Sequence, residues 1–113
     1  MHFMVTGWDG SDEGATERRL AARAAHIAEG AKMTAAGQLP YGAALMSEAS
    51  EGQAPRMIGS VMILNLSSRE ELDRWLASEP YVVQKVWQKI EIRPVQPGPA
   101  FVHLSEPAKP SAI

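Results

Sequence analysis

The segment at residues 56–66, RMIGSVMILNL, constrains the fold more than any other part of this sequence. Its length and its apolar residues are typical of a β-strand, in which successive side chains point to opposite faces. Met57, Val61 and Ile63 fall on one face, and Ile58, Met62, Leu64 and Leu66 fall on the other. Because both faces are apolar, both have to be covered. We therefore expect a sheet with a further layer against each side.

Three more strands and two helices are predicted around this segment. The strands are expected at residues 2–8, 38–47 and 86–95, and the helices at residues 15–36 and 67–77. Pro40 lacks a backbone donor, so its strand belongs at a sheet edge. Apolar residues recur at helical spacing in the first helix, namely Leu20, Ala24, Ile27 and Ala31. In the last strand, the pattern predicts Val86, Ile90 and Ile92 on one face and Trp87, Lys89, Glu91 and Arg93 on the other.

The order strand, helix, strand, strand, helix, strand is that of the α+β, ferredoxin-like split βαβ fold. In that fold both helices lie on one face of an antiparallel sheet and leave the other face bare. Since the strand at 56–66 is apolar on both faces, we expect the bare face to meet the same face of a second copy. The sequence thus predicts a homodimer with its sheets face to face.

One domain is expected at residues 1–95, because 113 residues are enough for one core but too few for separate cofactor and substrate domains. Residues 96–113 are predicted to be a tail without a core of its own. Five of the eight prolines lie from Pro94 onwards. The apolar run FVHL in this tail could still dock on the domain or on a partner subunit.

Composition narrows the function classes. A net charge of −2 provides no basic field for a phosphate backbone, so we expect no nucleic-acid partner. No apolar run is long enough to span a bilayer, and no signal-peptide pattern is present, so we expect a cytoplasmic protein without a membrane contact. The chain has no cysteine. We also expect neither a cofactor nor a metal site, because phosphate-binding glycine motifs and metal-ligand spacings are missing.

A histidine and an arginine on the first predicted helix are the first candidates for chemistry. Arg19, Arg23, His26 and Gly30 share one stripe of that helix. Neutral imidazole is the form that a general base needs, and an arginine one turn away favours that form and can bind an anion. The alternative is that His26 only packs at the border between core and solvent, which is the commoner role of such a histidine.

The second candidates follow the second predicted helix. Glu79 precedes Pro80 and Tyr81, and a carboxylate at this point could orient an imidazole. The simpler interpretation is an acidic residue in solvent at a helix end. That position is unfavourable for an acid in the field of the helix dipole, which favours a paired role.

Several short motifs in a fixed order resemble the YCII-related (YciI-like) family. They are R-x-x-H at Arg23 and His26, A-x-G-x-L at residues 35–39, S-x-E-E-x-x-x-W at residues 68–75, and the turn Glu79-Pro80-Tyr81 before a strand with a proline near its end. The likeness covers about residues 3 to 95. Glu79 stands where the family usually has aspartate, so the charge is kept but the side chain is one methylene longer.

This resemblance implies a dimeric α+β barrel of the ferredoxin-like kind, similar to muconolactone isomerase-like proteins, with a histidine and an aspartate paired in a pocket of each subunit. One member of the family is a dehydrochlorinase that acts on a chlorinated hydroxylated aromatic compound. Carried over to this chain, the resemblance assigns the family histidine to His26 and the preceding arginine to Arg23.

Two functions are therefore kept open. The first is a small cofactor-independent lyase or isomerase, dehydrochlorinase-like, in which His26 and Glu79 are catalytic and Arg23 and Tyr81 bind a small anionic or phenolic molecule. The alternative is a non-catalytic dimeric module that binds a metabolite or serves as an accessory interaction domain, and for which Arg23 and apolar walls would suffice. A cofactor-free oxygenase of the same fold is a third possibility, of which the sequence shows no positive sign.

Overall fold

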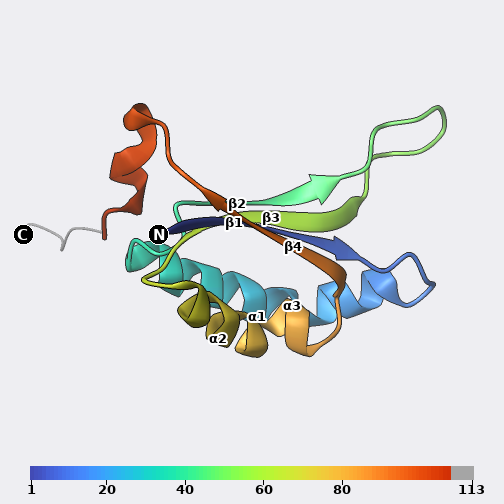
Figure 1. The fold of residues 1–113 in the computed structure, drawn as a ribbon. Coiled ribbons are helices and arrows are strands. Elements are labelled where there is room, and N and C mark those ends of the chain that lie inside the picture. The colour runs from blue at the N-terminus through green and yellow to red at the C-terminus, as the bar shows by residue number, and fades with distance from the viewer. Residues whose placement is uncertain (108–113) are drawn as a thin grey trace, which may run out of the picture.

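The computed structural model describes residues 1–107, which form one antiparallel sheet with three α-helices against one of its faces (Figure 1). The elements in chain order are β1 (His2–Asp9), α1 (Ala15–Ala35), β2 (Tyr41–Met46), β3 (Met57–Asn65), α2 (Arg69–Ser78), α3 (Pro80–Val83), β4 (Trp87–Val95) and the short 3₁₀ helix η1 (Pro99–Ser105). The four strands have the order β2-β3-β1-β4. This order confirms the ferredoxin-like α+β fold, with β2 at an edge as Pro40 indicated.

The core lies between the sheet and the helices. Phe3 and Val5 of β1 point into it, and their cross-strand partners on β3, Leu64 and Met62, do the same. The helices contribute the buried side chains of Ala22, Met33, Leu72 and Leu76. Burial of these apolar groups is the main force that holds α1 and α2 against the sheet.

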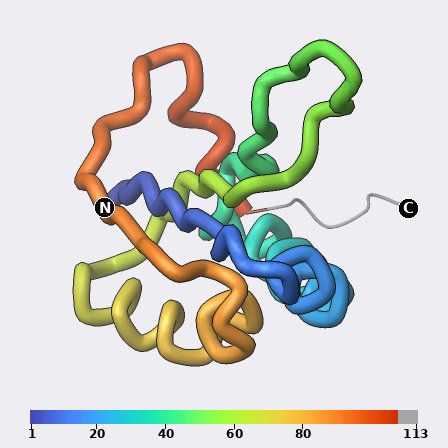
Figure 2. Tube along the Cα trace, turned by 90° about the vertical axis from the view of Figure 1, so that its right-hand side faces the viewer, coloured from blue at the N-terminus to red at the C-terminus, as the bar shows by residue number. Residues whose placement is uncertain are grey.

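The opposite face of the sheet carries two residues of the second apolar set that the sequence predicted for β3, whereas the third, Met57, borders the same cavity as Arg19 and His26 of α1. Val61 and Ile63 lie on this opposite face beside Thr6 and Met4 of β1. All four side chains are only partly buried in the single chain. Figure 2 shows the tail and the β2–β3 connection rising on this side of the sheet, away from the helices. We call this side the outer face.

Trp87 does not lie where the alternation in the last strand placed it. The register between β1 and β4 shifts between Trp8 and Asp9, and Asp9 pairs with Trp87. This irregularity turns the Trp87 indole to the helix side, where it is 5% exposed. Lys89, farther along β4, pairs with Trp8 and stays on the outer face as expected. A single bulge is enough to reverse the facing of a side chain.

The apolar stripe of α1 also differs from a simple amphipathic pattern. Leu20 and Ile27 are 60% and 48% exposed, whereas Arg19, Ala22 and Met33 are the buried residues of this helix. The helix therefore turns an arginine toward the sheet and leaves two large apolar side chains outside. The reason lies in the polar partners that Arg19 finds beneath the helix.

Short polar contacts fix the ends of α2. The Ser68 hydroxyl accepts from the Glu71 amide at 3.1 Å, and a Glu71 carboxylate oxygen accepts from the Ser67 amide at 3.0 Å. This is the capping box that the sequence predicted, with its two halves on adjacent serines. At the other end, Pro80 ends α2 but also begins the single turn α3, a position where its missing N–H costs nothing.

The tail has more structure than expected. Residues Pro99–Ser105 form η1, and the Ser105 hydroxyl lies 2.5 Å from His2 Nε2. Gly37, at a φ of 76°, makes room for the backbone near Ser105, which any Cβ at this position would meet at 2.6 Å. The rest of the predicted tail, residues 108–113, lies outside the described residues. Within residues 1–107, no helix combines the length and the apolar character that crossing a bilayer requires.

Candidate active site

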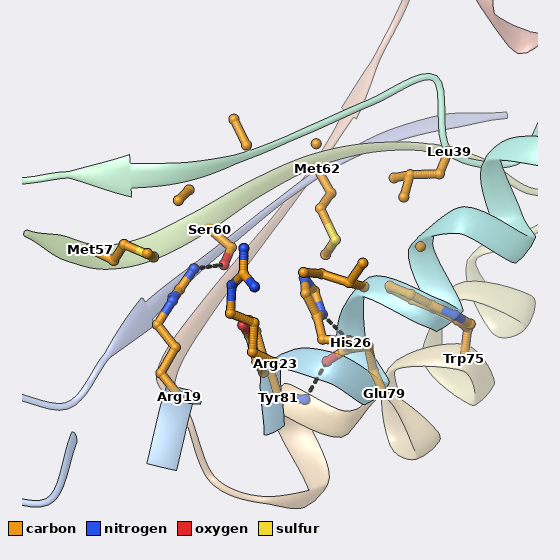
Figure 3. Close-up of a pocket in the computed structure, with 15 residues that line it drawn as sticks. Arg19, Arg23, His26, Leu39, Met57, Ser60, Met62, Trp75, Glu79 and Tyr81 are labelled. Atoms are coloured by element: carbon orange, nitrogen blue, oxygen red, sulfur yellow. Dashed lines mark hydrogen bonds and ion pairs between the residues drawn. The ribbon is translucent and has the colours of Figure 1, made fainter. Parts of the chain in front are cut away.

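A cavity of about 340 Å³ opens between α1 and the half of the sheet formed by β2 and β3. Its size is at the lower end of that of small-molecule sites. Figure 3 shows Arg23 and His26 reaching from α1 toward Ser60 and Met62 on β3. Small residues on β2 open space at the edge of the sheet, and apolar walls come from Leu39, Met57, Met62 and Trp75. Polar groups are thus few and gathered in a largely apolar site.

The centre of the cavity wall is a histidine and glutamate pair. His26 Nδ1 is hydrogen-bonded to one carboxylate oxygen of Glu79, and the other oxygen accepts from the backbone N–H of Tyr81 at 2.6 Å. Glu79 is 1% exposed, and the His26 side chain is 20% exposed. Because a carboxylate only accepts, a neutral imidazole bonded in this way carries its proton on Nδ1 and keeps the lone pair of Nε2.

The pair has its position because Glu79 sits between two helices. Glu79 ends α2 and caps the first turn of α3, so its backbone and one carboxylate oxygen are both fixed. Pro80 holds the entry to that turn with its restricted φ. The extra methylene of glutamate does not prevent the contact with His26. The sequence expectation that these two residues meet agrees with this geometry.

Tyr81 holds the imidazole from one side. Its ring stacks on His26 with centroids 3.8 Å apart and an interplanar angle of 8°, and Trp87 meets both rings edge-on. Burial raises the pKa of the Tyr81 hydroxyl, while the positive charges of Arg19 and Arg23 act in the opposite direction. The phenol therefore stays protonated at neutral pH. It borders the cavity beside both arginines.

The two arginines of the helix stripe have different surroundings. Arg23 is exposed and lines the cavity, and no hydrogen bond or ion pair to another part of residues 1–107 holds its guanidinium. Arg19 is buried, with Nη1 at 2.9 and 3.0 Å from the two carboxylate oxygens of Asp9 and with Nη2 at 3.1 Å from the Ser60 hydroxyl. Arg23 is thus free to meet an anion, and Arg19 belongs to a fixed network.

Asp9 and Ser60 were not identified from the sequence, and neither was the buried position of Arg19. Their sequence signals are weak, because an aspartate after a strand and a serine within one are common. The one sequence signal that could have pointed to this network is Ser60, because it is a polar residue at an inward position of a strand that is otherwise apolar on that face. Within residues 1–107, no three His, Asp or Glu side chains gather closely enough to hold a metal ion.

Fold and site together define a ferredoxin-like protein with a histidine and carboxylate pair in a small apolar pocket. The chain belongs to the YCII-related domain family, whose model matches residues 1–96. A comparison with proteins of curated function finds no significant match.

A solved structure supports the same fold. The 5-chloro-2-hydroxyhydroquinone dehydrochlorinase TftG from Burkholderia phenoliruptrix AC1100, in complex with 2,5-dihydroxybenzoquinone, is similar with a TM-score of 0.73 and 19% sequence identity. The similarity covers 87% of this chain and 96% of TftG. At this level of identity the comparison concerns the backbone arrangement, and the chemistry of this chain has to be argued from its own residues.

Proposed function

We propose that this protein is a small cofactor-independent enzyme of the lyase or isomerase type, with His26 as general base and a small anionic or phenolic molecule as substrate. The observation that carries the proposal is the Glu79 carboxylate, almost fully buried and bonded to His26 Nδ1. A buried carboxylate in this place orients an imidazole and stabilises the imidazolium that forms when the base takes a proton.

The bound Nδ1–H leaves Nε2 to accept the proton. Stacking on Tyr81 and the edge contact of Trp87 fix the plane of the ring, so that the lone pair has a defined direction. A general base held in position contributes about 10²- to 10⁴-fold to the rate of proton transfer. His26 would then return the proton to another atom in an isomerisation, or release it to solvent after an elimination.

Arg23 would bind the negative charge of the substrate. Its guanidinium faces the cavity and has no internal carboxylate to satisfy it among the described residues. The Tyr81 hydroxyl is a second donor at the same wall. The apolar walls suit an aromatic or short aliphatic body, and the volume of about 340 Å³ suits one small ring.

Elimination of hydrogen chloride is one reaction of this kind, and it is the type named for TftG. The base takes a proton from the substrate, the electron pair of the broken bond moves into the conjugated system, and chloride leaves with the electrons of its bond to carbon. Proton and chloride together make up the lost HCl, so no oxidant or reductant is needed. The same base could also move a proton between two positions of an enol.

We also propose that the protein acts as a homodimer through its outer face. Val61 and Ile63 make an apolar strip there beside Met4. Tyr41 on the edge strand adds an aromatic side chain that is 58% exposed in the single chain. Apolar surface of this kind on an antiparallel sheet suits the packing of a second sheet at the distance of a sandwich.

The test uses the two compounds named for TftG. We expect the protein to bind 2,5-dihydroxybenzoquinone and to release chloride from 5-chloro-2-hydroxyhydroquinone. His26→Ala should lower kcat by about 10²- to 10⁴-fold, and Arg23→Met should mainly raise KM. Glu17→Gln, at an exposed position on α1, is the matched control and should behave like the parent. Binding without chloride release from this or related halogenated phenols would favour the non-catalytic binding module instead.

A further inference from the structure

Ser60 occupies a position where a polar side chain is unusual. It lies on the helix side of β3, between Gly7 of β1 and Ala44 of β2. It is 3% exposed and borders the cavity. Neither strand neighbour has a polar side chain, so the partners of the hydroxyl have to lie on the side of the sheet that faces the helices and the cavity. Figure 3 shows it pointing to that side.

The Ser60 oxygen accepts two hydrogen bonds. Arg19 Nη2 donates to it at 3.1 Å and the indole Nε1–H of Trp87 donates at 3.3 Å. A guanidinium and an indole N–H can only donate, and a hydroxyl oxygen has two lone pairs. Both lone pairs are therefore engaged, and the proton of the Ser60 hydroxyl has to point elsewhere. No hydrogen bond of the described residues provides an acceptor for it.

Neither donor can turn away from Ser60. Arg19 is held by both oxygens of Asp9, and these two side chains are 7% and 6% exposed. Trp87 is 5% exposed and packs on the backbone of Gly7. The network thus fixes the direction of the free O–H and also polarises it, since a hydroxyl that accepts from a cation becomes a stronger donor.

We infer that Ser60 is a substrate-binding residue whose hydroxyl donates a hydrogen bond to a carbonyl, enolate or phenolate oxygen of the bound molecule. This inference rests on the proposed function, because it uses the same cavity. His26 borders the cavity from α1, whereas Ser60 borders it from the sheet (Figure 3). The substrate therefore has an oxygen acceptor on the side that faces the sheet, in conjugation with the atom that loses its proton.

This arrangement gives Ser60 a part in the reaction. When His26 Nε2 takes the proton, the electron pair of the broken bond spreads toward the conjugated oxygen, where negative charge develops. The Ser60 O–H donates to that oxygen, and the charge of Arg19 lies directly behind the hydroxyl. Donors that are already in place where charge develops stabilise it without reorganisation.

The experiment uses 4-hydroxyacetophenone with a ¹³C-labelled carbonyl as the probe. Its binding is measured by calorimetry, and its carbonyl stretch by isotope-edited infrared spectroscopy. In the parent protein we expect a carbonyl band below that of the free compound in an apolar solvent. Ser60→Ala should weaken binding about tenfold to a hundredfold and should move the band back to higher frequency, as loss of a hydrogen bond to a developing charge requires.

Trp87→Phe separates this role from general damage to the network. It removes one of the two donors to Ser60 but keeps the hydroxyl and the Arg19 donor, so the carbonyl band should stay below that of the free compound, as it does not in Ser60→Ala. Both variants are first shown to be folded by their unfolding curves. Unchanged affinity and an unchanged band in Ser60→Ala would overturn the inference and leave the proposed function standing. A parent protein that binds no phenolic or carbonyl probe would overturn the proposed function and this inference with it.

Discussion

Glu79 connects the backbone of two helices with the imidazole of His26. One of its oxygens accepts from the Tyr81 amide and the other is bonded to His26. The same side chain therefore caps the start of α3 and favours the Nδ1–H tautomer of a neutral His26. Replacing Glu79 would therefore remove the N-terminal cap of α3 and the hydrogen bond that orients the His26 imidazole.

The ionisation of Tyr81 reports on the charges in the cavity. Because a guanidinium stabilises the phenolate, Arg23 lowers the pKa of Tyr81, and Arg23→Met should raise this pKa above that of the parent. Tyrosinate absorbance measures the titration, in a Tyr41→Phe background that leaves Tyr81 as the only tyrosine of the chain. Arg69→Met, on the exposed surface of α2, is the control. An unchanged Tyr81 titration in Arg23→Met would show that Arg23 does not face the phenol.

Some candidate site residues could be predicted from short sequence patterns, and others could not. Helical spacing places Arg23 and His26 on one stripe, and an acid before Pro80 at the end of a helix is conspicuous, so these positions could be predicted. That the Glu79 side chain would meet His26 was a hypothesis that the family resemblance supported. Ser60 and Arg19 could not be predicted as partners, because they are 41 positions apart and meet only when α1 crosses the sheet.

At the level of elements, the strands and both long helices follow from alternation, helical spacing and capping residues. The exceptions arise where tertiary contacts determine which face of an element a side chain occupies. Trp87 turns inward at the irregularity beside Asp9, and it can do so only because Gly7 leaves the space for its indole. A Cβ at Gly7 would lie 2.4 Å from Cδ2 of Trp87. The alternation of residues along β4 does not show that Gly7 on the neighbouring strand β1 leaves space for the indole.

Gly7→Ala should therefore destabilise the protein. The added methyl group cannot coexist with the indole in its present place, and overpacking of a core costs about 1–3 kcal/mol. Urea unfolding gives the free energy of unfolding. The matched control is Gly42→Ala, because a Cβ there would lie 3.7 Å from Cγ of Met62, an ordinary contact. Equal stability of the two variants would contradict the packing described for Trp87.

Within residues 1–107 of the single chain, the apolar outer face of the sheet has no second layer packed against it. A strand that is apolar on both sides needs a second layer, and in the described part of the chain α1, α2 and α3 all lie on one side of the sheet (Figure 1). The tail stands at one end of this face, with Phe101 and Leu104 61% and 44% exposed. A second copy of the chain would cover β1 and β3 and could also bury these tail residues.

Sedimentation equilibrium tests this arrangement. The parent should have about twice the mass of 12.3 kDa, and Ile63→Asp should become monomeric or lose its fold, because it places a charge in an apolar interface. Val83→Asp introduces the same charge on α3, at a residue 58% exposed on the helix side, and should leave the mass unchanged. A parent protein that sediments as a monomer at micromolar concentration would refute the face-to-face dimer.

We propose that Glu79 holds neutral His26 with its proton on Nδ1 and leaves Nε2 free to act as a base. A long-range ¹H–¹⁵N correlation spectrum of the imidazole, recorded on the ligand-free protein with and without Glu79→Leu, tests it most directly. We predict that neutral His26 of the parent is the Nδ1–H tautomer and that this preference disappears in Glu79→Leu. An Nε2–H tautomer in the parent, or the same tautomer mixture in both proteins, would show that Glu79 does not set the tautomer of His26.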